Sequence, residues 1–126
     1  MSINPIEDVR SDTLKPSQVL ERAAELLTPR GRWTQGAASR DAEGNEDDDV
    51  NLLPNAVCWC AWGAMLHVSG ERYIGTKGVP GEAFNYLERH LGVSRIPDWN
   101  DAASRRKGQV VQALRDAAAL ARAEGQ

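Results

Sequence analysis

The sequence predicts a mainly α protein, a compact four-helix domain with a short irregular or β-hairpin insert after the first helix. Two observations lead to this prediction. Apolar residues recur at intervals of three and four over four separate stretches, as on one face of an α-helix. Pro and Gly residues, which end helices and favour turns, stand between these stretches. We expect residues 15–124 to form one helical domain, and residues 1–14 to form a flexible N-terminal arm.

Length and composition are those of a globular protein of one domain. The 126 residues are 41% hydrophobic and 26% charged, with a net charge of −3. No run of about 18 apolar residues is present, so no transmembrane helix is expected and a membrane is not an expected partner. The slightly negative charge differs from that of a basic nucleic-acid-binding module, so nucleic acid is not an expected partner either. The first ten residues do not resemble a secretory signal, and we therefore expect a cytoplasmic protein.

The first predicted helix begins near Pro16, because proline is favoured in the first turn of a helix. It ends at residues 28–31, where Pro and Gly interrupt the apolar pattern. Its expected inner face consists of the apolar residues Val19, Leu20, Ala23, Ala24, Leu26 and Leu27.

Residues 32–54 form the predicted insert. Apolar and polar residues alternate poorly here, but residues 32–45 are compatible with a short β-hairpin whose turn runs from Asp41 to Asn45. Trp33 is expected to anchor the insert to the helices, since burial of an indole contributes about 2–3 kcal/mol.

The most apolar stretch, residues 56–68, predicts a central helix with Asn55 as its N-cap. It is apolar over most of its circumference, so we expect it to be packed from several sides. Gly63 in a helix interior costs about 1 kcal/mol relative to Ala. We therefore expect Gly63 to permit the close approach of another backbone or of an indole ring.

The third predicted helix begins at Pro80 and ends at Gly92. Its expected inner face consists of Ala83, Phe84, Leu87 and Leu91. The last helix is expected to follow an N-cap at Asn100 or Ser104. Its expected inner face consists of Val110, Val111, Leu114, Ala117, Ala118 and Ala121. The many alanines of this helix leave a homodimer open as an alternative.

The two cysteines, Cys58 and Cys60, are separated by one residue. This spacing suits neither a mutual disulfide in a helix nor a zinc site, so we expect reduced thiols, no metal site and no cofactor. Cys58 is the candidate reactive thiol, because a helix beginning after Asn55 would place it in the first turn, where the helix dipole lowers a thiol pKa. The flanking Val57 and Trp59 favour burial, which raises that pKa, so the inert thiol is the preferred interpretation.

Residues 41–49 contain six acidic side chains. We expect a solvated loop whose charges repel one another. A calcium-binding EF-hand loop is excluded, because Glu46 stands where that loop requires Gly. The acidic loop is instead a candidate surface for a partner protein.

Four short motifs resemble those of a family of small bacterial and phage proteins of unknown function. They are W-x-Q-G-A at residues 33–37, R-D at 40–41, W-C-A-x-G-A at 59–64 and W-N-D at 99–101, and the resemblance extends over roughly residues 17–123. It implies a cytosolic protein, either bacterial or made by a phage in its host, and it implies no particular chemistry. The acidic loop is longer here than in the family pattern.

The polar and aromatic side chains of these motifs supply the candidate binding residues, which are Trp33, Gln35, Arg40, Trp99 and Asp101. Two interpretations of the W-N-D motif are open. In one, Trp99 packs on the core, and Asn100 or Asp101 caps the last helix. In the other, Asp101 joins Arg40 and Gln35 in a polar pocket bordered by Trp33.

These features favour a small cytosolic protein, phage-encoded in one interpretation, that binds a protein partner such as a host protein and catalyses no reaction. No complete catalytic or metal-binding set is visible, the chain has an acidic loop, and four tryptophans are more than such a core requires. The alternative is a small-molecule-binding or hydrolase-like site formed by Gln35, Arg40, Cys60 and Asp101.

Overall fold

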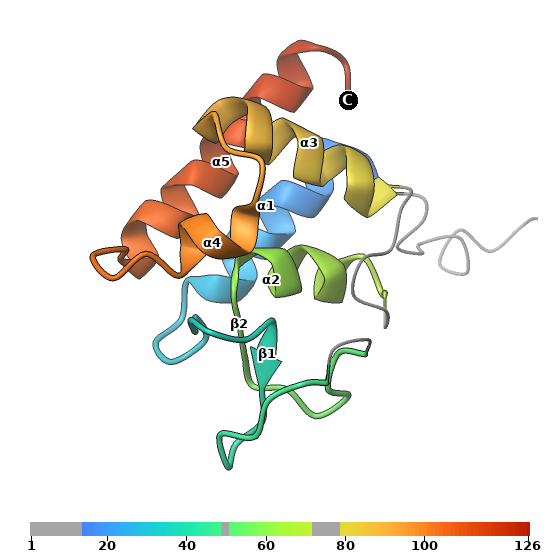
Figure 1. Cartoon of the computed structure of the whole chain (residues 1–126). Coiled ribbons are helices and arrows are strands. Elements are labelled where there is room, and N and C mark those ends of the chain that lie inside the picture. The colour runs from blue at the N-terminus through green and yellow to red at the C-terminus, as the bar shows by residue number, and fades with distance from the viewer. Residues whose placement is uncertain (1–13, 49–50, 72–78) are drawn as a thin grey trace, which may run out of the picture.

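The computed structural model describes residues 14–48, 51–71 and 79–126. Its elements are α1 (Pro16–Leu27), β1 (Ser39–Arg40), β2 (Cys58–Trp59), α2 (Ala61–Val68), α3 (Val79–Leu91), α4 (Ile96–Asn100) and α5 (Lys107–Ala123) (Figure 1). The mainly α fold with a small insert after the first helix is confirmed. Most of the predicted N-terminal arm lies outside the described residues, and its last residue, Leu14, is buried. None of the helices in these ranges is long and apolar enough to cross a bilayer.

Helices α1 and α5 form an antiparallel pair (Figure 1). At one end, Lys107 Nζ donates a hydrogen bond to the carbonyl of Thr28 at 2.6 Å. At the other end, Ser17 Oγ donates to the carbonyl of Gln126 at 2.8 Å. The predicted inner faces of both helices are buried between these ends, apart from Leu26, which is partly buried.

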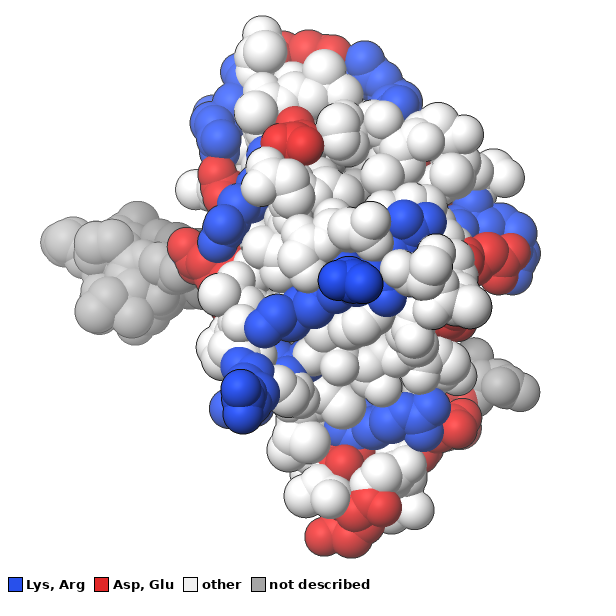
Figure 2. Space-filling view, turned by 90° about the vertical axis from the view of Figure 1, so that its left-hand side faces the viewer, with Lys and Arg blue, Asp and Glu red and all other residues white. Residues whose placement is uncertain are grey.

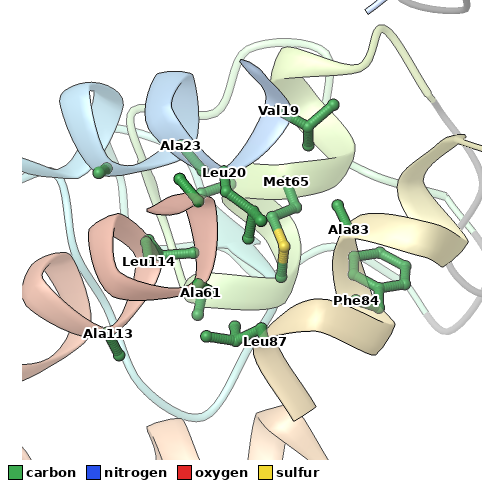
Figure 3. Close-up of a cluster of buried hydrophobic side chains, with 14 of the residues drawn as sticks. Val19, Leu20, Ala23, Ala61, Met65, Ala83, Phe84, Leu87, Ala113 and Leu114 are labelled. Carbon is green, nitrogen blue, oxygen red and sulfur yellow. The ribbon is translucent and has the colours of Figure 1, made fainter. Parts of the chain in front are cut away.

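Side chains of α1, α2, α3 and α5 meet in one hydrophobic core (Figure 3). Met65 of α2 lies among Leu20, Leu87 and Leu114, which come from the three other helices, and all four side chains are fully buried. The expectation that the middle helix is packed from several sides is confirmed, because α2 contacts α1, α3 and α4.

The predicted start of the second helix is wrong. Helix α2 begins at Ala61 with Cys60 as its N-cap, and Asn55 is not a cap. Residues 58–59 instead form strand β2, which pairs antiparallel with β1. On the other edge of β2, the backbone N–H of Trp59 donates to the carbonyl of Arg32 at 2.8 Å. The carbonyl of Trp59 accepts from the backbone N–H of Thr34 at 2.9 Å. Backbone groups on both sides thus hold this apolar segment extended.

The predicted turn from Asp41 to Asn45 is present. The N–H of Asp41 donates to the carbonyl of Asn45 at 3.0 Å, and Arg40 and Glu46 form an antiparallel bridge across the turn. Strand β1, however, pairs with β2, which follows the predicted insert. The small sheet therefore closes the whole insert.

The segment before the last helix also differs from the prediction. Residues 96–100 form the short helix α4, and α5 begins at Lys107 with Arg106 as its N-cap. Neither Asn100 nor Ser104 caps α5. The backbone N–H of Arg106 instead donates a hydrogen bond to Gln109 Oε1 at 2.9 Å.

Gly63 lies directly against the backbone of Ala38. A Cβ atom at Gly63 would collide with the carbonyl oxygen of Ala38, which also accepts a hydrogen bond from the N–H of Cys60 at 3.1 Å. The expectation that Gly63 permits close backbone approach is thus confirmed. This contact sets how closely the insert packs on α2.

We predict that Gly63→Ala lowers the free energy of unfolding by about 2 kcal/mol, because the insert must move away from α2. Gly108→Ala is the matched control. Gly108 is also helical and has open space around it, so this change should stabilise the protein by about 0.5–1 kcal/mol through helix propensity. Urea unfolding of both variants checks this, and equal effects would contradict it.

Candidate functional site

Segments from three of the sequence motifs meet at the fully buried side chain of Asn100, at the end of α4. Its Oδ1 atom accepts hydrogen bonds from Trp33 Nε1 at 2.8 Å and from the N–H of Ala61 at 3.0 Å. Its Nδ2 atom donates to the carbonyl of Thr34 at 3.1 Å and to Asp101 Oδ1 at 2.9 Å. We call this set of residues the polar clasp: Trp33, Thr34, Gln35, Asn100 and Asp101.

Gln35 and Asp101 complete the polar clasp. Gln35 Nε2 donates to the carbonyls of Asn100 and Ala102 at 2.9 and 3.0 Å. Asp101 Oδ1 accepts from the N–H of Gly36 at 3.0 Å. The insert therefore supplies partners for carbonyl groups at the end of α4, which have no partners within that helix.

Arg40 lies at the edge of the polar clasp and is half-buried. Its Nε atom donates to Thr34 Oγ1 at 3.1 Å, and Nη2 donates to the carbonyl of Gln35 at 3.0 Å. Nη1 forms an ion pair with Glu46 at 3.2 Å. The guanidinium is thus engaged in holding the insert together.

The structure brings four of the five predicted binding residues close together, namely Trp33, Gln35, Arg40 and Asp101. The fifth, Trp99, has the guanidinium of Arg105 stacked over its ring at 4.0 Å. The interpretation in which Asn100 or Asp101 caps the last helix is wrong, since Asn100 binds the first N–H of α2 instead. In the other interpretation, Gln35, Arg40 and Asp101 form a polar pocket beside Trp33. These residues lie near one another, but their polar atoms are mostly engaged by other groups, such as Asn100, Thr34 and Glu46. A role for these residues in binding a ligand stays a prediction.

A groove of about 510 Å³ lies beside the polar clasp, between the insert and helices α3 and α4. Its floor and sides include the apolar residues Ala37, Ala38, Trp62 and Pro97. Its acidic lining residues are Glu46, Asp47, Asp48, Glu88 and Asp101. We call it the acidic groove. Of the predicted hydrolase-like set, Cys60 and Asp101 line it, whereas Gln35 and Arg40 do not.

The acidic loop is partly ordered by its own carboxylates. Asp41 is buried and accepts hydrogen bonds from Asn45 and from the N–H of Glu43, and the bond from the Asn45 side chain contributes most to lowering the pKa of Asp41. Asp47 accepts from the N–H of Ser39 at 3.0 Å, while its partial burial raises its pKa. These positions belong to a structured turn, whereas Glu43, Glu46 and Asp48 are exposed, as expected of a solvated loop. Asp49 lies outside the described residues.

The two thiols occupy different environments. Cys60 is 3% exposed, its Sγ atom accepts from the N–H of Gly63 at 3.4 Å, and burial raises the pKa of its thiol to about 12. Cys58, the predicted reactive thiol, lies in β2, half-buried, with its sulfur 4.0 Å from the carbonyl oxygen of Arg40. The argument for its activation by a helix N-terminus therefore fails. Neither thiol is hydrogen-bonded to His67 or His90.

His67 packs against Trp59 with ring centroids 4.6 Å apart, and burial lowers the pKa of its imidazole. His90 lies 3.6 Å from a carboxylate oxygen of Asp116. Over the described ranges, no group of three or more His, Cys, Asp and Glu side chains is arranged to hold a metal ion.

The model of a protein family described as a family of unknown function, DUF6197, matches residues 11–120. The chain belongs to the DUF6197 family. The matched region includes the polar clasp and the acidic groove, and the resemblance to a family of unknown function is confirmed. No curated protein and no solved structure matches this DUF6197 member significantly.

Sequence reasoning did not find the central role of Asn100 in this DUF6197 protein, nor the contribution of α3 to the acidic groove. Asn100 follows Trp99 just before the last helix, where the sequence alone also fits an N-cap residue. Its actual partners are 39 or more residues away in the chain, apart from Asp101. A polar amide with such distant partners leaves no local signal in the sequence.

We predict that Asn100→Ala lowers the free energy of unfolding by about 3 kcal/mol. The change leaves the buried N–H of Ala61 and the carbonyl of Thr34 without partners, and each such loss costs about 1–3 kcal/mol. Trp33→Phe is the control, because it removes one donor and leaves the other bonds of Asn100 in place, at a cost of about 1 kcal/mol. Urea unfolding measures both, and an Asn100→Ala protein as stable as the wild type would refute the argument.

We also predict that Cys60 is inert in the folded protein. Burial raises the pKa of Cys60 to about 12, so very little of this thiol is ionised at neutral pH, and the thiolate is the reactive form. A Cys58→Ser variant, which leaves Cys60 as the remaining thiol, should react with a disulfide reagent only as fast as it unfolds. The same variant in denaturant should react at once. Rapid reaction in native buffer would show that Cys60 is accessible.

Proposed function

We propose that this protein is a non-catalytic binding protein that holds a positively charged segment of a partner protein in the acidic groove. The observation that carries the proposal is the lining of this groove, in which five acidic residues surround an apolar floor. A long basic side chain has the same two parts, an apolar stem and a charged head. The groove offers complementary surfaces to both.

The balance of charge in the groove supports a cationic ligand. Arg95 is the one basic lining residue, and its Nε atom lies 2.7 Å from a carboxylate oxygen of Asp98. Glu46 is paired with Arg40. The side chain of Glu88, by contrast, has no hydrogen bond or ion pair with any described residue. Glu88 is therefore the carboxylate most available to an incoming positive charge.

The floor of the acidic groove supports recognition by contact as well as by charge. Trp62 stacks on Phe84 with ring centroids 4.0 Å apart, so its indole is fixed by the core. Ala38 is held by the contact with Gly63. A rigid floor reduces the ordering that binding requires, which favours affinity.

The burial of Cys60 supports a non-catalytic role. A hydrolase-like reaction at Gln35, Arg40, Cys60 and Asp101 would require an activated nucleophile. Burial raises the pKa of Cys60 to about 12, and the guanidinium of Arg40 is engaged by Thr34, Gln35 and Glu46. The small-molecule-binding alternative retains support from Asp101, which lines the acidic groove.

We also propose that the protein is encoded by a phage and acts in the cytoplasm of the host, where its partner is a protein of that host. The support is the resemblance of its motifs to those of small bacterial and phage proteins. Two free cysteines are consistent with a reducing compartment. Self-association through the alanine-rich α5 is a weaker proposal, because its inner-face alanines are buried against the rest of the domain.

A labelled short peptide containing several arginines in a neutral background tests the proposed function. We expect Glu88→Lys to weaken its binding by about tenfold, because the change places a positive charge inside the acidic groove. The control is Glu25→Lys, which makes the same change in net charge at an exposed position of α1. The affinity of this variant for the peptide should stay near that of the wild type. Fluorescence anisotropy at low ionic strength measures both.

Two results would contradict the proposed function. Equal weakening by Glu88→Lys and Glu25→Lys would show that the peptide responds to total charge and not to the acidic groove. Free arginine that binds as tightly as the peptide would instead favour the small-molecule alternative.

A further inference from the structure

A second charged surface lies where α1 ends and α5 begins. The hydrogen bond from Lys107 to Thr28 and the bond from Trp33 to Asn100 bring the segments after α1 and before α5 side by side. We call the basic residues of these segments the basic edge: Arg30, Arg32, Arg105, Arg106 and Lys107. Figure 2 shows Lys and Arg atoms across the middle of this face of the molecule.

Three cations of the basic edge are fixed by uncharged partners. Arg105 stacks over the ring of Trp99 at 4.0 Å and donates from Nε to the carbonyl of Trp99 at 2.9 Å. Lys107 donates to the carbonyl of Thr28 at 2.6 Å, and Arg32 donates to the carbonyl of Val57 at 3.3 Å. These contacts restrict the side chains without neutralising them. A ligand would then lose less side-chain entropy on binding.

The positive charge of the basic edge is not balanced nearby. None of its five side chains forms an ion pair with a carboxylate of the described residues. Asp101 is the one acidic residue in the two segments, and its Oδ1 atom already accepts from Gly36 and Asn100. The chain as a whole has a net charge of −3, so this concentration of positive charge is local.

We propose that the basic edge is an interaction surface for an acidic segment of a partner protein. Carboxylates match the forked N–H geometry of arginine, and an arginine held against a tryptophan presents its remaining N–H groups in a fixed direction. This surface is separate from the acidic groove, and the inference does not depend on what the groove binds.

Nucleic acid fits the basic edge less well. A long polyanion that lies on this edge is repelled by the net negative charge of the chain. It is also repelled by the nearby acidic groove, which Asp101 helps to line. Binding of single strands also uses aromatic rings as stacking platforms for bases. Of the two indoles beside this edge, Trp99 has one face covered by Arg105, and Trp33 is tied to Asn100 by a hydrogen bond.

The test uses the full chain and two labelled probes of equal charge, a short glutamate-rich peptide and a single-stranded DNA oligonucleotide. The test variant is Arg30→Glu/Arg106→Glu, because both side chains are exposed and make no hydrogen bond within the described residues. The matched control is Arg22→Glu/Arg115→Glu, which makes the same change in charge at exposed positions on α1 and α5. Circular dichroism checks that all variants are folded.

We expect the wild type to bind the peptide more tightly than the oligonucleotide, with an affinity that falls as salt is added. The test variant should lose about tenfold or more in peptide affinity, and the control variant should lose less than about threefold. In addition, Trp99→Leu should weaken peptide binding severalfold, because it releases Arg105.

Three outcomes would overturn the proposal. One is undetectable binding of the peptide by the folded wild type. Another is an equal loss of affinity in the test and control variants, which would indicate a response to total charge. The third is tighter binding of the oligonucleotide than of the peptide, which would assign the basic edge to nucleic acid.

Discussion

One buried side-chain amide holds the parts of this protein in register. Asn100 has no exposed surface, and each hydrogen-bonding position of its amide has a partner in another segment or in the adjoining residue. A displacement of the insert or of α2 would leave a buried polar group without a partner, which costs more than an ordinary hydrogen bond contributes. Hydrophobic burial alone would tolerate such shifts, because it has no directional preference. The amide therefore specifies one arrangement of elements whose apolar contacts would permit several.

This constraint also shapes both charged surfaces. Asp101 follows Asn100 directly, so the bond from Gly36 that fixes Asp101 also fixes one wall of the acidic groove. The lining also includes Glu88 of α3, a helix whose inner face lies in the core. Trp99 precedes Asn100, and its ring supports Arg105 on the basic edge. Consecutive residues thus contribute to two surfaces of opposite charge through one fixed backbone segment.

The three longest helices could be predicted from the sequence because their information is local. Apolar spacing, an early proline and a terminal glycine define α1, α3 and the inner face of α5 within each segment itself. The close approach at Gly63 could also be predicted, since a helical glycine needs a compensating contact.

Other features depend on distant partners. The apolar run at residues 57–60 is compatible with a helix and with a buried strand. Only its pairing with residues 32–40 decides that it is extended. Four of the five candidate site residues could be predicted to lie together from their motifs. The engagement of Arg40 by Thr34 and Gln35 could not, because it depends on how the insert folds back on itself. The acidic groove could likewise not be predicted from the sequence, since its lining comes from the insert, α2, α3 and the α4 region.

The span of the polar clasp has a consequence for how quickly the chain folds. The hydrogen bonds that join residues 33–36 to residues 100–102 connect positions 65–67 apart, and α1 pairs with α5 from the other end of the sequence. Helical domains usually fold fast because their contacts are close in sequence. Here the chain must close large loops, at an entropic cost, before these contacts can form. The transition state should therefore be reached more slowly than in helical bundles of similar length whose neighbouring helices are consecutive.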